Sequence, residues 1–242
     1  MKLTFFQKFE TLLADVMAEL RQIPDKLTIE KMVRELVYSK LGKKLPESVN
    51  APNPLVVNVS ARHCHLTQEA VEALFGAGYQ LNVHKNLYQA GQFAAKETVT
   101  LIGPRSRVIS NLRILGPCRK MNQVELAYTD AVSLGFDIPA RLSGDVEGTP
   151  GCMLMGPAGF FEMDSGVIRA LRHVHMGEED AAFYGVKNGD MMNLKIHGDC
   201  GITLANTLVR VTKGFKLEVH VDTDEANACH LNPKSFCELL KQ

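Results

Sequence analysis

The stretch "SARHCHL" (residues 60–66) has a second copy in "LRHVHM" (residues 171–176), and each copy places two histidines either side of one other residue. The chain has eight histidines, so these two Arg-His-X-His units account for half of them. His63 and His173 stand 110 residues apart, and an acidic segment with the pattern of a short helix follows each unit. This internal repeat predicts two similar halves.

Each unit also has the spacing of a two-histidine metal ligand pair. On a strand, side chains alternate between faces, so His63 and His65 point the same way and Cys64 points the opposite way. The same alternation pairs His173 with His175. Imidazole pairs of this kind suit zinc and similar divalent ions. A surface pair or a hydrogen-bonded pair is the alternative for one unit, whereas two units in repeat register favour a metal site.

A fifth histidine is a candidate for the same site. His220 lies in the strand-like stretch "KLEVHVDTDEANA", which ends in an acidic turn, and it would supply the ligand that one pair lacks. A half-buried strand histidine is the alternative. His84, His197 and His230 have no partner at ligand spacing, and we interpret them as surface or hydrogen-bonded histidines.

The segment "GPCRKMNQVELAYTDAVSLGFDIPARLSGDVEGTPG" (residues 116–151) carries further polar chemistry. Arg119 offers a guanidinium suited to phosphate, and Glu125 offers a carboxylate suited to a metal or to proton transfer. A surface salt bridge is the alternative for this pair. Arg141, Asp145 and Glu147 are better explained as stabilising a glycine-rich turn.

Composition limits the kind of partner. Lys plus Arg and Asp plus Glu each total 27, so we expect neither a nucleic-acid surface nor a polybasic membrane contact. The six cysteines show no CxxC spacing and no apolar run is long enough to span a bilayer. These features predict a cytoplasmic protein whose cysteines are small buried apolar residues.

The pattern along the chain predicts a mainly β fold with short helices. Short strands between Gly, Pro, Asn and Asp turns indicate small β-barrels or sandwiches and not a doubly wound sheet, preceded by N-terminal helices. With the internal repeat, a symmetric chain of two similar small β-barrel domains would place both histidine units at one junction. "PLVVNVSARHCHL", "VELAYT" and "GVIRALRHVHM" are each expected to form one strand. The expected domains are an amphipathic helix (1–22), a helix and linker (23–54), a first β-barrel (55–150) and a second β-barrel (151–242).

Five separated blocks in one order resemble the PduL family of phosphate propanoyltransferases, also called phosphotransacylases: "VNVSARHCHLT", the 116–151 segment, "RHVHMGEEDA", "GVKNGD" and "LEVHVDTDEANA". The resemblance runs from about residue 50 to about residue 230. It implies two β-barrel domains with a dinuclear zinc site between them. It also implies an enzyme that interconverts an acyl-CoA (propanoyl-CoA or acetyl-CoA) and phosphate with an acyl phosphate and free CoA.

The resemblance assigns ligands to two zinc ions. The remaining coordination position of the first ion would accept the CoA sulfur, and the second ion would make the site dinuclear. The first set is His63, His65 and Glu125, and the second set is His173, His175 and His220. Cys64 stands where an apolar residue is common in the family, and we interpret the change as packing.

The resemblance also assigns substrate contacts. Arg119 matches the family arginine that binds phosphate and is the expected catalytic residue. Ser60 and Arg62 belong to the same signature and are expected to line the substrate site. The expected small molecules are therefore acyl-CoA, phosphate and acyl phosphate.

Two other functions are compatible with the histidine pattern. A dinuclear zinc hydrolase would use the same ligands, although "HCHLTQ" lacks the HxHxDH run of one major hydrolase class. A zinc-stabilised interaction module is the non-enzymatic alternative, although structural zinc sites usually have four protein ligands.

The N-terminal stripe of apolar residues has two interpretations. Residues 1–20 would form an encapsulation peptide that binds shell or cargo proteins of a bacterial microcompartment, as in some members of the family. Alternatively they form an ordinary helix that packs on the core or at an oligomer interface. A homo-oligomer is expected in either case.

Overall fold

The structure, a computed structural model, describes residues 53–242, and strands dominate this part of the chain. The mainly β fold class is therefore confirmed. The predicted helix over 1–22 and almost all of the predicted helix and linker over 23–54 lie outside the described residues. The helices described are short: α3 (Gln68–Phe75), α4 (Tyr128–Leu134), α5 (Glu178–Tyr184) and α6 (Thr223–Ala228).

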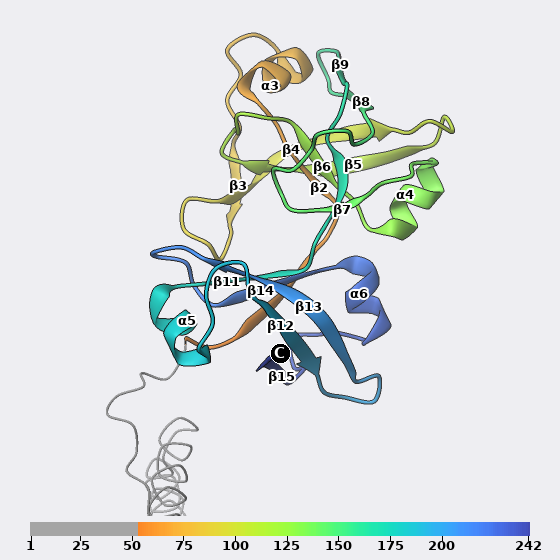
Figure 1. Ribbon diagram of the computed structural model, residues 1–242. Helices are drawn as coiled ribbons and strands as arrows, with labels where there is room; N and C mark the ends of the chain where they lie inside the picture. Colours follow the sequence, from red (N-terminus) through yellow and green to blue (C-terminus); the bar gives the residue numbers. More distant parts are fainter. Residues whose placement is uncertain (1–52) are drawn as a thin grey trace, which may run out of the picture. The chain divides into compact units, whose positions relative to one another are not determined.

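Two curled sheets make up residues 53–242 (Figure 1). The nine-stranded sheet has the order β7-β10-β6-β2-β5-β4-β8-β9, with β3 paired to β4, and the six-stranded sheet has the order β1-β14-β11-β13-β12-β15. The nine are β2 (His63–His65), β3 (Val83–Asn86), β4 (Phe93–Ile102), β5 (Val108–Gly116), β6 (Gln123–Glu125), β7 (Ala140–Arg141), β8 (Cys152–Met155), β9 (Phe160–Met163) and β10 (Val167–Ala170). The six are β1 (Val56–Ser60), β11 (His173–Met176), β12 (Met191–Ile196), β13 (Ile202–Val211), β14 (Glu218–Asp222) and β15 (Cys237–Lys241).

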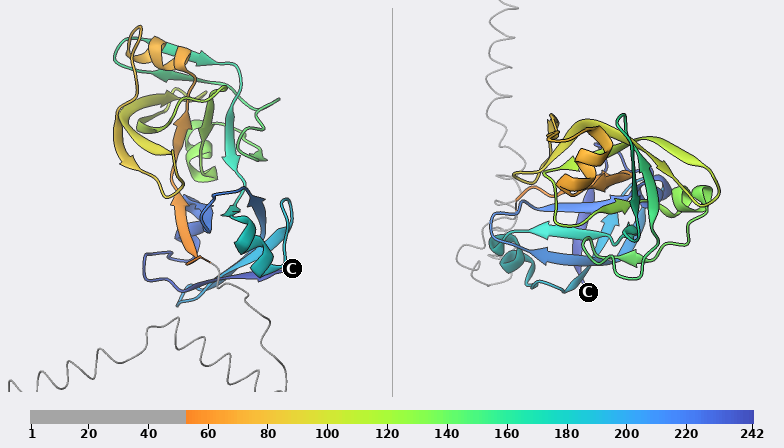
Figure 2. Two further views of the ribbon diagram at one scale, coloured as in Figure 1. Left: turned by 90° about the vertical axis from the view of Figure 1, so that its left-hand side faces the viewer. Right: turned by 90° about the horizontal axis from the view of Figure 1, so that it is seen from above.

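Sheet membership crosses the predicted domain division at residues 150 and 151. β1 lies in the predicted first domain but pairs in parallel with β14 of the six-stranded sheet, and β10 lies in the predicted second domain but pairs in parallel with β6 of the nine-stranded sheet. Each Arg-His-X-His unit therefore lies where the chain passes from one sheet to the other (Figure 2). The division of the chain into the predicted domains stays a prediction.

The two long strands predicted around these units are each broken in two. "PLVVNVSARHCHL" forms β1 and β2, and "GVIRALRHVHM" forms β10 and β11. At the first break, Ala61 N–H donates to the carbonyl of Val59 over 3.1 Å, which closes a tight three-residue turn. The prediction of single strands was wrong because apolar periodicity does not show where a strand changes sheet.

A helix follows each strand that carries a candidate ligand. α3 follows β2, α4 follows β6, α5 follows β11 and α6 follows β14. The prediction that "VELAYT" is one strand was wrong, because α4 begins at Tyr128, and the acidic turn predicted after His220 is α6. Asp222 caps α6, and its side chain accepts from the backbone N–H of Glu225.

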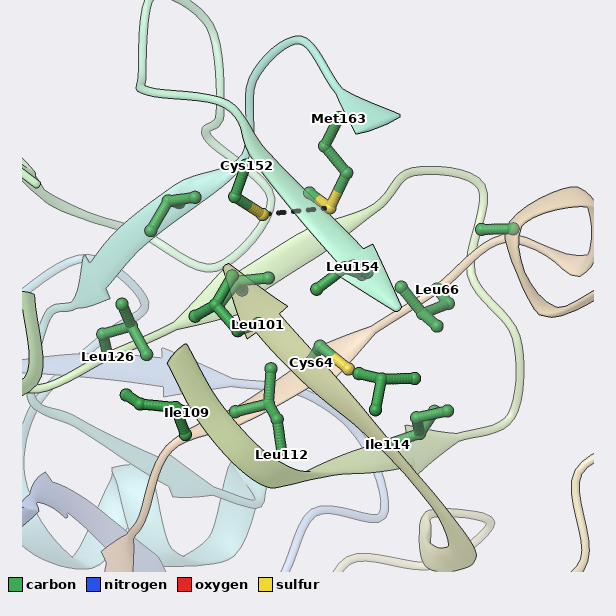
Figure 3. Packing of buried hydrophobic residues seen from close by; sticks show 14 of the residues in the cluster. Cys64, Leu66, Leu101, Ile109, Leu112, Ile114, Leu126, Cys152, Leu154 and Met163 are labelled. Carbon is green, nitrogen blue, oxygen red and sulfur yellow. Dashed lines mark hydrogen bonds between the residues drawn. The ribbon is translucent and has the colours of Figure 1, made fainter. Parts of the chain in front are cut away.

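Each sheet has its own apolar core. In the first, Cys64 and Leu66 are fully buried on β2 and just after it, and Leu101, Leu112 and Ile114 pack around them (Figure 3). Cys64 points into this core because it alternates with His63 and His65, as predicted. Burial raises the pKa of the Cys64 thiol, so the side chain is a packing residue and not a nucleophile.

The prediction that all six cysteines are buried was only partly right. Cys64, Cys152 and Cys229 are buried, Cys118 and Cys237 are intermediate, and Cys200 is exposed.

Candidate metal centre and active site

The first ligand set lies on two adjacent antiparallel strands. β2 pairs with β6 so that His63 is directly opposite Glu125. The Nε2 atoms of His63 and His65 are 3.2 Å apart, and the Glu125 carboxylate lies 3.5 Å from the first and 3.9 Å from the second. All three side chains are buried, at 6%, 4% and 8% exposure. The structure thus brings Glu125 next to a histidine pair that lies about sixty positions earlier in the sequence.

The second ligand set repeats this arrangement. β11 pairs with β14 so that His173 is directly opposite His220. The Nε2 atoms of His173 and His175 are 3.0 Å apart, and the His220 ring stacks parallel to that of His173 with centroids 5.0 Å apart. His220 therefore occupies in the second half the position that Glu125 occupies in the first.

Backbone carbonyls fix the orientation of three of these rings. Nδ1 of His63 lies 2.8 Å from the carbonyl of Ala61, and Nδ1 of His173 lies 2.8 Å from the carbonyl of Leu171. Nδ1 of His65 lies 3.3 Å from the carbonyl of Leu115. A carbonyl only accepts, so each Nδ1 carries the proton and each Nε2 presents a lone pair. Metal-bound histidines are held in this way.

Convergent lone pairs make each set a good fit for a metal ion. Two Nε2 lone pairs 3.0 to 3.2 Å apart repel each other unless a cation or a proton lies between them. In each set the candidate ligand atoms all lie within 4.8 Å of one another. Three nitrogen or carboxylate donors match the zinc sites that keep one coordination position free for water or substrate. The residues therefore fit the two zinc ions that the family resemblance implies.

Burial keeps most of these imidazoles neutral. It lowers the pKa of His65 to about 3, of His175 to about 3 and of His173 to about 4, with neighbouring cationic groups adding to the shift in each. For His63, burial also disfavours the charged form, but the adjacent Glu125 carboxylate outweighs it and raises the pKa. Burial disfavours the charged form of Glu125, but the neighbouring histidines, His63 foremost, outweigh it and hold the pKa of the carboxyl well below its ordinary value, so the group is ionised.

One small hollow, of about 20 Å³, touches members of both sets. Its lining includes Glu125 from the first set, His173 and His220 from the second, and Ser60 at the end of β1. Glu125 also acts electrostatically on His173. The structure thus places the predicted Ser60 beside both ligand sets.

Gln123 supports the first set, although the sequence did not single it out. Its amide Nε2 donates to Glu125 over 2.6 Å and to the hydroxyl of Ser143 over 2.9 Å. Arg119 donates to the same hydroxyl over 3.2 Å. One short network therefore joins the predicted arginine to the predicted carboxylate through Ser143.

Glu218 supports the second set from the matching position. It is 2% exposed, it lies 3.1 Å from Nε2 of His220, and it accepts from Asn58 and from Gln89, the latter over 2.7 Å. Gln123 precedes Glu125 by two residues as Glu218 precedes His220 by two. That shared spacing is the signal by which the sequence would have revealed both.

The arginines of the two units have structural partners. Arg62 donates to Asp130 of α4 over 2.6 Å, and Arg172 donates to Glu225 of α6 over 2.6 Å. Each acid lies five residues after the third member of a ligand set. Each unit is therefore joined to the helix of its own half by an equivalent ion pair. The Arg62 side chain is 49% exposed and is not among the residues that line the hollow, and its contact with substrate stays a prediction.

The remaining polar residues singled out in the sequence lie in structural contacts or at the surface. Arg141 is 3.6 Å from Asp145, as expected of a turn. His197 pairs with Glu238 over 2.5 Å, and His84 and His230 are exposed.

Fold and site together define a β protein with two histidine-rich sets of metal-ligand type, the first buried and the second partly buried. A family model described as phosphate propanoyltransferase matches residues 56–232. The chain belongs to the phosphate propanoyltransferase family and is an acyltransferase, so it is neither a hydrolase nor an interaction module.

Relatives of that name cover most of the chain. Phosphate propanoyltransferase of Planctopirus limnophila is 55% identical over 220 residues, covering 88% of this chain and 90% of that protein. The Thermotoga maritima protein is 51% identical and covers 74% of this chain and 85% of its own length. The Salmonella typhimurium protein is 44% identical, with 86% and 99% covered. Between residues 53 and 242, no helix is long and apolar enough to cross a membrane.

Proposed function

We propose that the chain converts propanoyl-CoA or acetyl-CoA and phosphate into the acyl phosphate and free CoA, and the reverse, at a site that holds two zinc ions. The observation that supports this most strongly is the pairing of His63 with Glu125 and of His173 with His220 at equivalent strand positions beside one hollow. Two three-residue ligand sets beside one space suit a reaction in which one anionic group, phosphate, replaces another, the CoA thiolate, on the acyl carbon.

The two ligand sets have different roles in this proposal. His63, His65 and Glu125 would hold the ion next to the CoA sulfur, and His173, His175 and His220 would hold the ion next to phosphate. Zinc bound there would stabilise a thiolate and neutralise charge on oxygen. The protein keeps the ligands ready by holding Nδ1–H of His63, His65 and His173 against backbone carbonyls.

Arg119 orients phosphate in this proposal. A phosphate oxygen attacks the thioester carbon, the C–S bond breaks, and the sulfur leaves with the electron pair as thiolate. A guanidinium can hold two phosphate oxygens at once. This places another phosphate oxygen against the acyl carbon and offsets the repulsion between negative charges. Ser143 holds Arg119 over 3.2 Å, so the guanidinium is already oriented. Phosphate is already an anion, so no general base is required.

Phosphate-dependent release of CoA tests the proposed reaction. Zinc-loaded protein is assayed with acetyl-, propanoyl- and butanoyl-CoA, with and without phosphate. Release that requires phosphate and yields acyl phosphate supports the proposal, whereas release that is equally fast in water alone contradicts it. His84→Ala is the matched control because His84 is exposed on β3, outside both sets.

Variants of Arg119 test its role in the same assay. Arg119→Ala should raise the KM for phosphate on the order of a hundredfold, as expected when a charge-assisted bidentate contact is lost. Arg119→Lys should recover only part of this, because lysine restores charge but not the planar fork. Zinc content should be unchanged in both variants. Unchanged kinetics in Arg119→Ala would move the phosphate role elsewhere.

We also propose that residues 1–20 direct the enzyme into a bacterial microcompartment by binding shell or cargo proteins, and that the enzyme assembles as a homo-oligomer in the cytoplasm. The apolar stripe of Phe5, Phe6 and Phe9 supports the first statement. Deleting residues 1–20 should leave activity intact and abolish co-purification with shells. A deletion variant that is inactive or unfolded would favour a helix that packs on the enzyme.

A further inference from the structure

Arg210 on β13 faces the second ligand set. β11 and β13 are parallel neighbours, and Arg210 is the direct partner of His175 in their register. Directly paired residues on adjacent strands project to the same face of a sheet. The guanidinium therefore lies on the face that carries His173, His175 and His220, and it acts electrostatically on the first two.

Arg210 is also close to Arg119, which comes from the first half of the chain. Burial lowers the pKa of Arg119, Glu125 partly offsets this, and Arg210 lowers it further. The guanidinium of Arg119, in the loop between β5 and β6, and that of Arg210 on β13 thus lie near enough to repel one another. Both are half-buried, so solvent screens them less than it would at the surface.

The charge of Arg210 is not neutralised by residues 53–242. Arg62, Arg169 and Arg172 each bond to a carboxylate, but Arg210 has no hydrogen bond or ion pair within the described part of the chain. Arg119 has only the neutral hydroxyl of Ser143 as a side-chain hydrogen-bond partner there. Two half-buried cations without a bonded acid make a place that attracts an anion.

The corresponding strand of the first half lacks this feature. β2 and β5 are parallel, with His63 paired to Arg113 and Cys64 to Ile114, so the next residue, Leu115, lies at the level that Arg210 occupies in the second half. Arg113 itself donates to the carbonyls of Ala95 and Lys96 and is thereby engaged. Each half consequently supplies one arginine without a bonded acid, Arg119 from the loop between β5 and β6 and Arg210 from β13.

We propose that Arg210 is a second anion-binding residue, which together with Arg119 holds the phosphate group that reacts with the acyl carbon. This inference rests on the proposed function. Two guanidinium groups from opposite halves hold a phosphate at more of its oxygens than one can, and they fix its direction relative to both ligand sets. Arg210 thereby sets the affinity for phosphate and not the affinity for the acyl-CoA.

Steady-state kinetics of Arg210→Gln and Arg210→Lys, with each substrate varied in turn, test the inference. Arg210→Gln should raise the KM for phosphate by roughly 10- to 100-fold, the range expected for losing hydrogen bonds to a charged group. Arg210→Lys should recover part of it. The KM for acyl-CoA and the zinc content should stay within about twofold of the parent, as should every parameter of the control Arg107→Gln, which changes an exposed arginine between β4 and β5.

Calorimetric titration of the zinc-loaded protein with inorganic phosphate, without acyl-CoA, separates this inference from the proposed reaction. Weaker phosphate binding in Arg210→Gln than in the parent supports the role of Arg210, even if the parent releases no CoA and the proposed reaction fails. Equal phosphate affinity in both proteins overturns the role of Arg210 and leaves the reaction standing. An effect confined to the KM for acyl-CoA also overturns it, because the arginine would then serve phosphates of CoA.

Discussion

The two halves of the described chain build their ligand sets on the same strand pairing but place their carboxylates differently. In the first half, Glu125 occupies the third ligand position and the neutral amide of Gln123 supports it. In the second half, His220 occupies that position and the carboxylate of Glu218 lies beside it. Each ligand set thus has one buried carboxylate in contact with it, and the position of this carboxylate differs by two residues between the halves.

This displacement gives the two metal positions different charge. A divalent ion bound by two imidazoles and Glu125 would carry one net positive charge, and one bound by three neutral imidazoles would carry two. The second position would therefore attract an anion more strongly, and Arg210 lies on the same face of the sheet as its ligands. The repeat supplies two similar sets of metal ligands. The replacement of Glu125 by His220 at the third position would suit the first set to the CoA sulfur and the second set to phosphate.

Removing a ligand should have the largest effect. Glu125→Ala and His173→Ala should each lower the zinc content from about two ions per chain to about one. Activity should fall on the order of a thousandfold, because several kcal/mol of charge stabilisation is lost. Elemental analysis and the CoA-release assay check this, with His84→Ala as control. His173→Ala protein with full metal content would remove His173 from the ligand list.

Making the halves alike should have the next largest effect. Glu125→His converts the first set to three histidines, so zinc should still bind, but activity should fall on the order of tenfold or more because the first ion then carries an extra positive charge. Zinc content and kcat, measured on the same sample, check this. A variant as active as the parent would show that the difference between the halves has no catalytic meaning.

The sequence showed the ligand types but not how they come together. His63 and His65 could be paired from their spacing, whereas the register that puts Glu125 opposite His63 joins residues about sixty positions apart. Arg210 sits in "TLVRVT", where an arginine on a short strand resembles any exposed residue. Its direction depends on pairing with β11, a parallel partner that local pattern cannot identify.

Changes of sheet were also beyond the sequence pattern. β1 and β2 form one apolar-rich stretch, yet they belong to different sheets. Each is short, and the turn at Ala61 contains neither Gly nor Pro. The mainly β class was predictable because the many short strands are separated by strong turn residues.

Residues behind the ligands should have a smaller effect. Gln123→Ala and Glu218→Gln should each weaken zinc binding about 10- to 100-fold, the usual cost of losing a partner that orients a metal ligand. Each variant should affect only the ion of its own half. Competition with a zinc-binding dye checks this. Equal weakening of both ions by either variant would show that the halves do not bind metal separately.

The smallest effect concerns acid and the metal-free protein. The pKa values of His65, His173 and His175 are lowered in the folded state to about 3, 4 and 3, from an ordinary value near 6.5. The unfolded chain therefore binds more protons in this range, so stability is full above about pH 6.5 and declines as the pH falls toward 4. The raised pKa of His63 opposes this in part.

Thermal unfolding of chelator-treated protein between pH 7.5 and pH 5 measures this effect. The Tm should fall on acidification, and it should fall less in His173→Gln, which removes one of the titrating groups. A Tm that is constant or rises over this range would contradict neutral buried imidazoles in both sets.

The most direct test of two cooperating metal positions is a zinc titration of metal-free protein in which bound metal and phosphate-dependent CoA release are measured on the same samples. Phosphate-dependent release should stay low while the first equivalent binds and rise as the second binds, reaching its maximum near two ions per chain. Full activity at one ion per chain would contradict the account, because one of the two ligand sets would then take no part in the reaction.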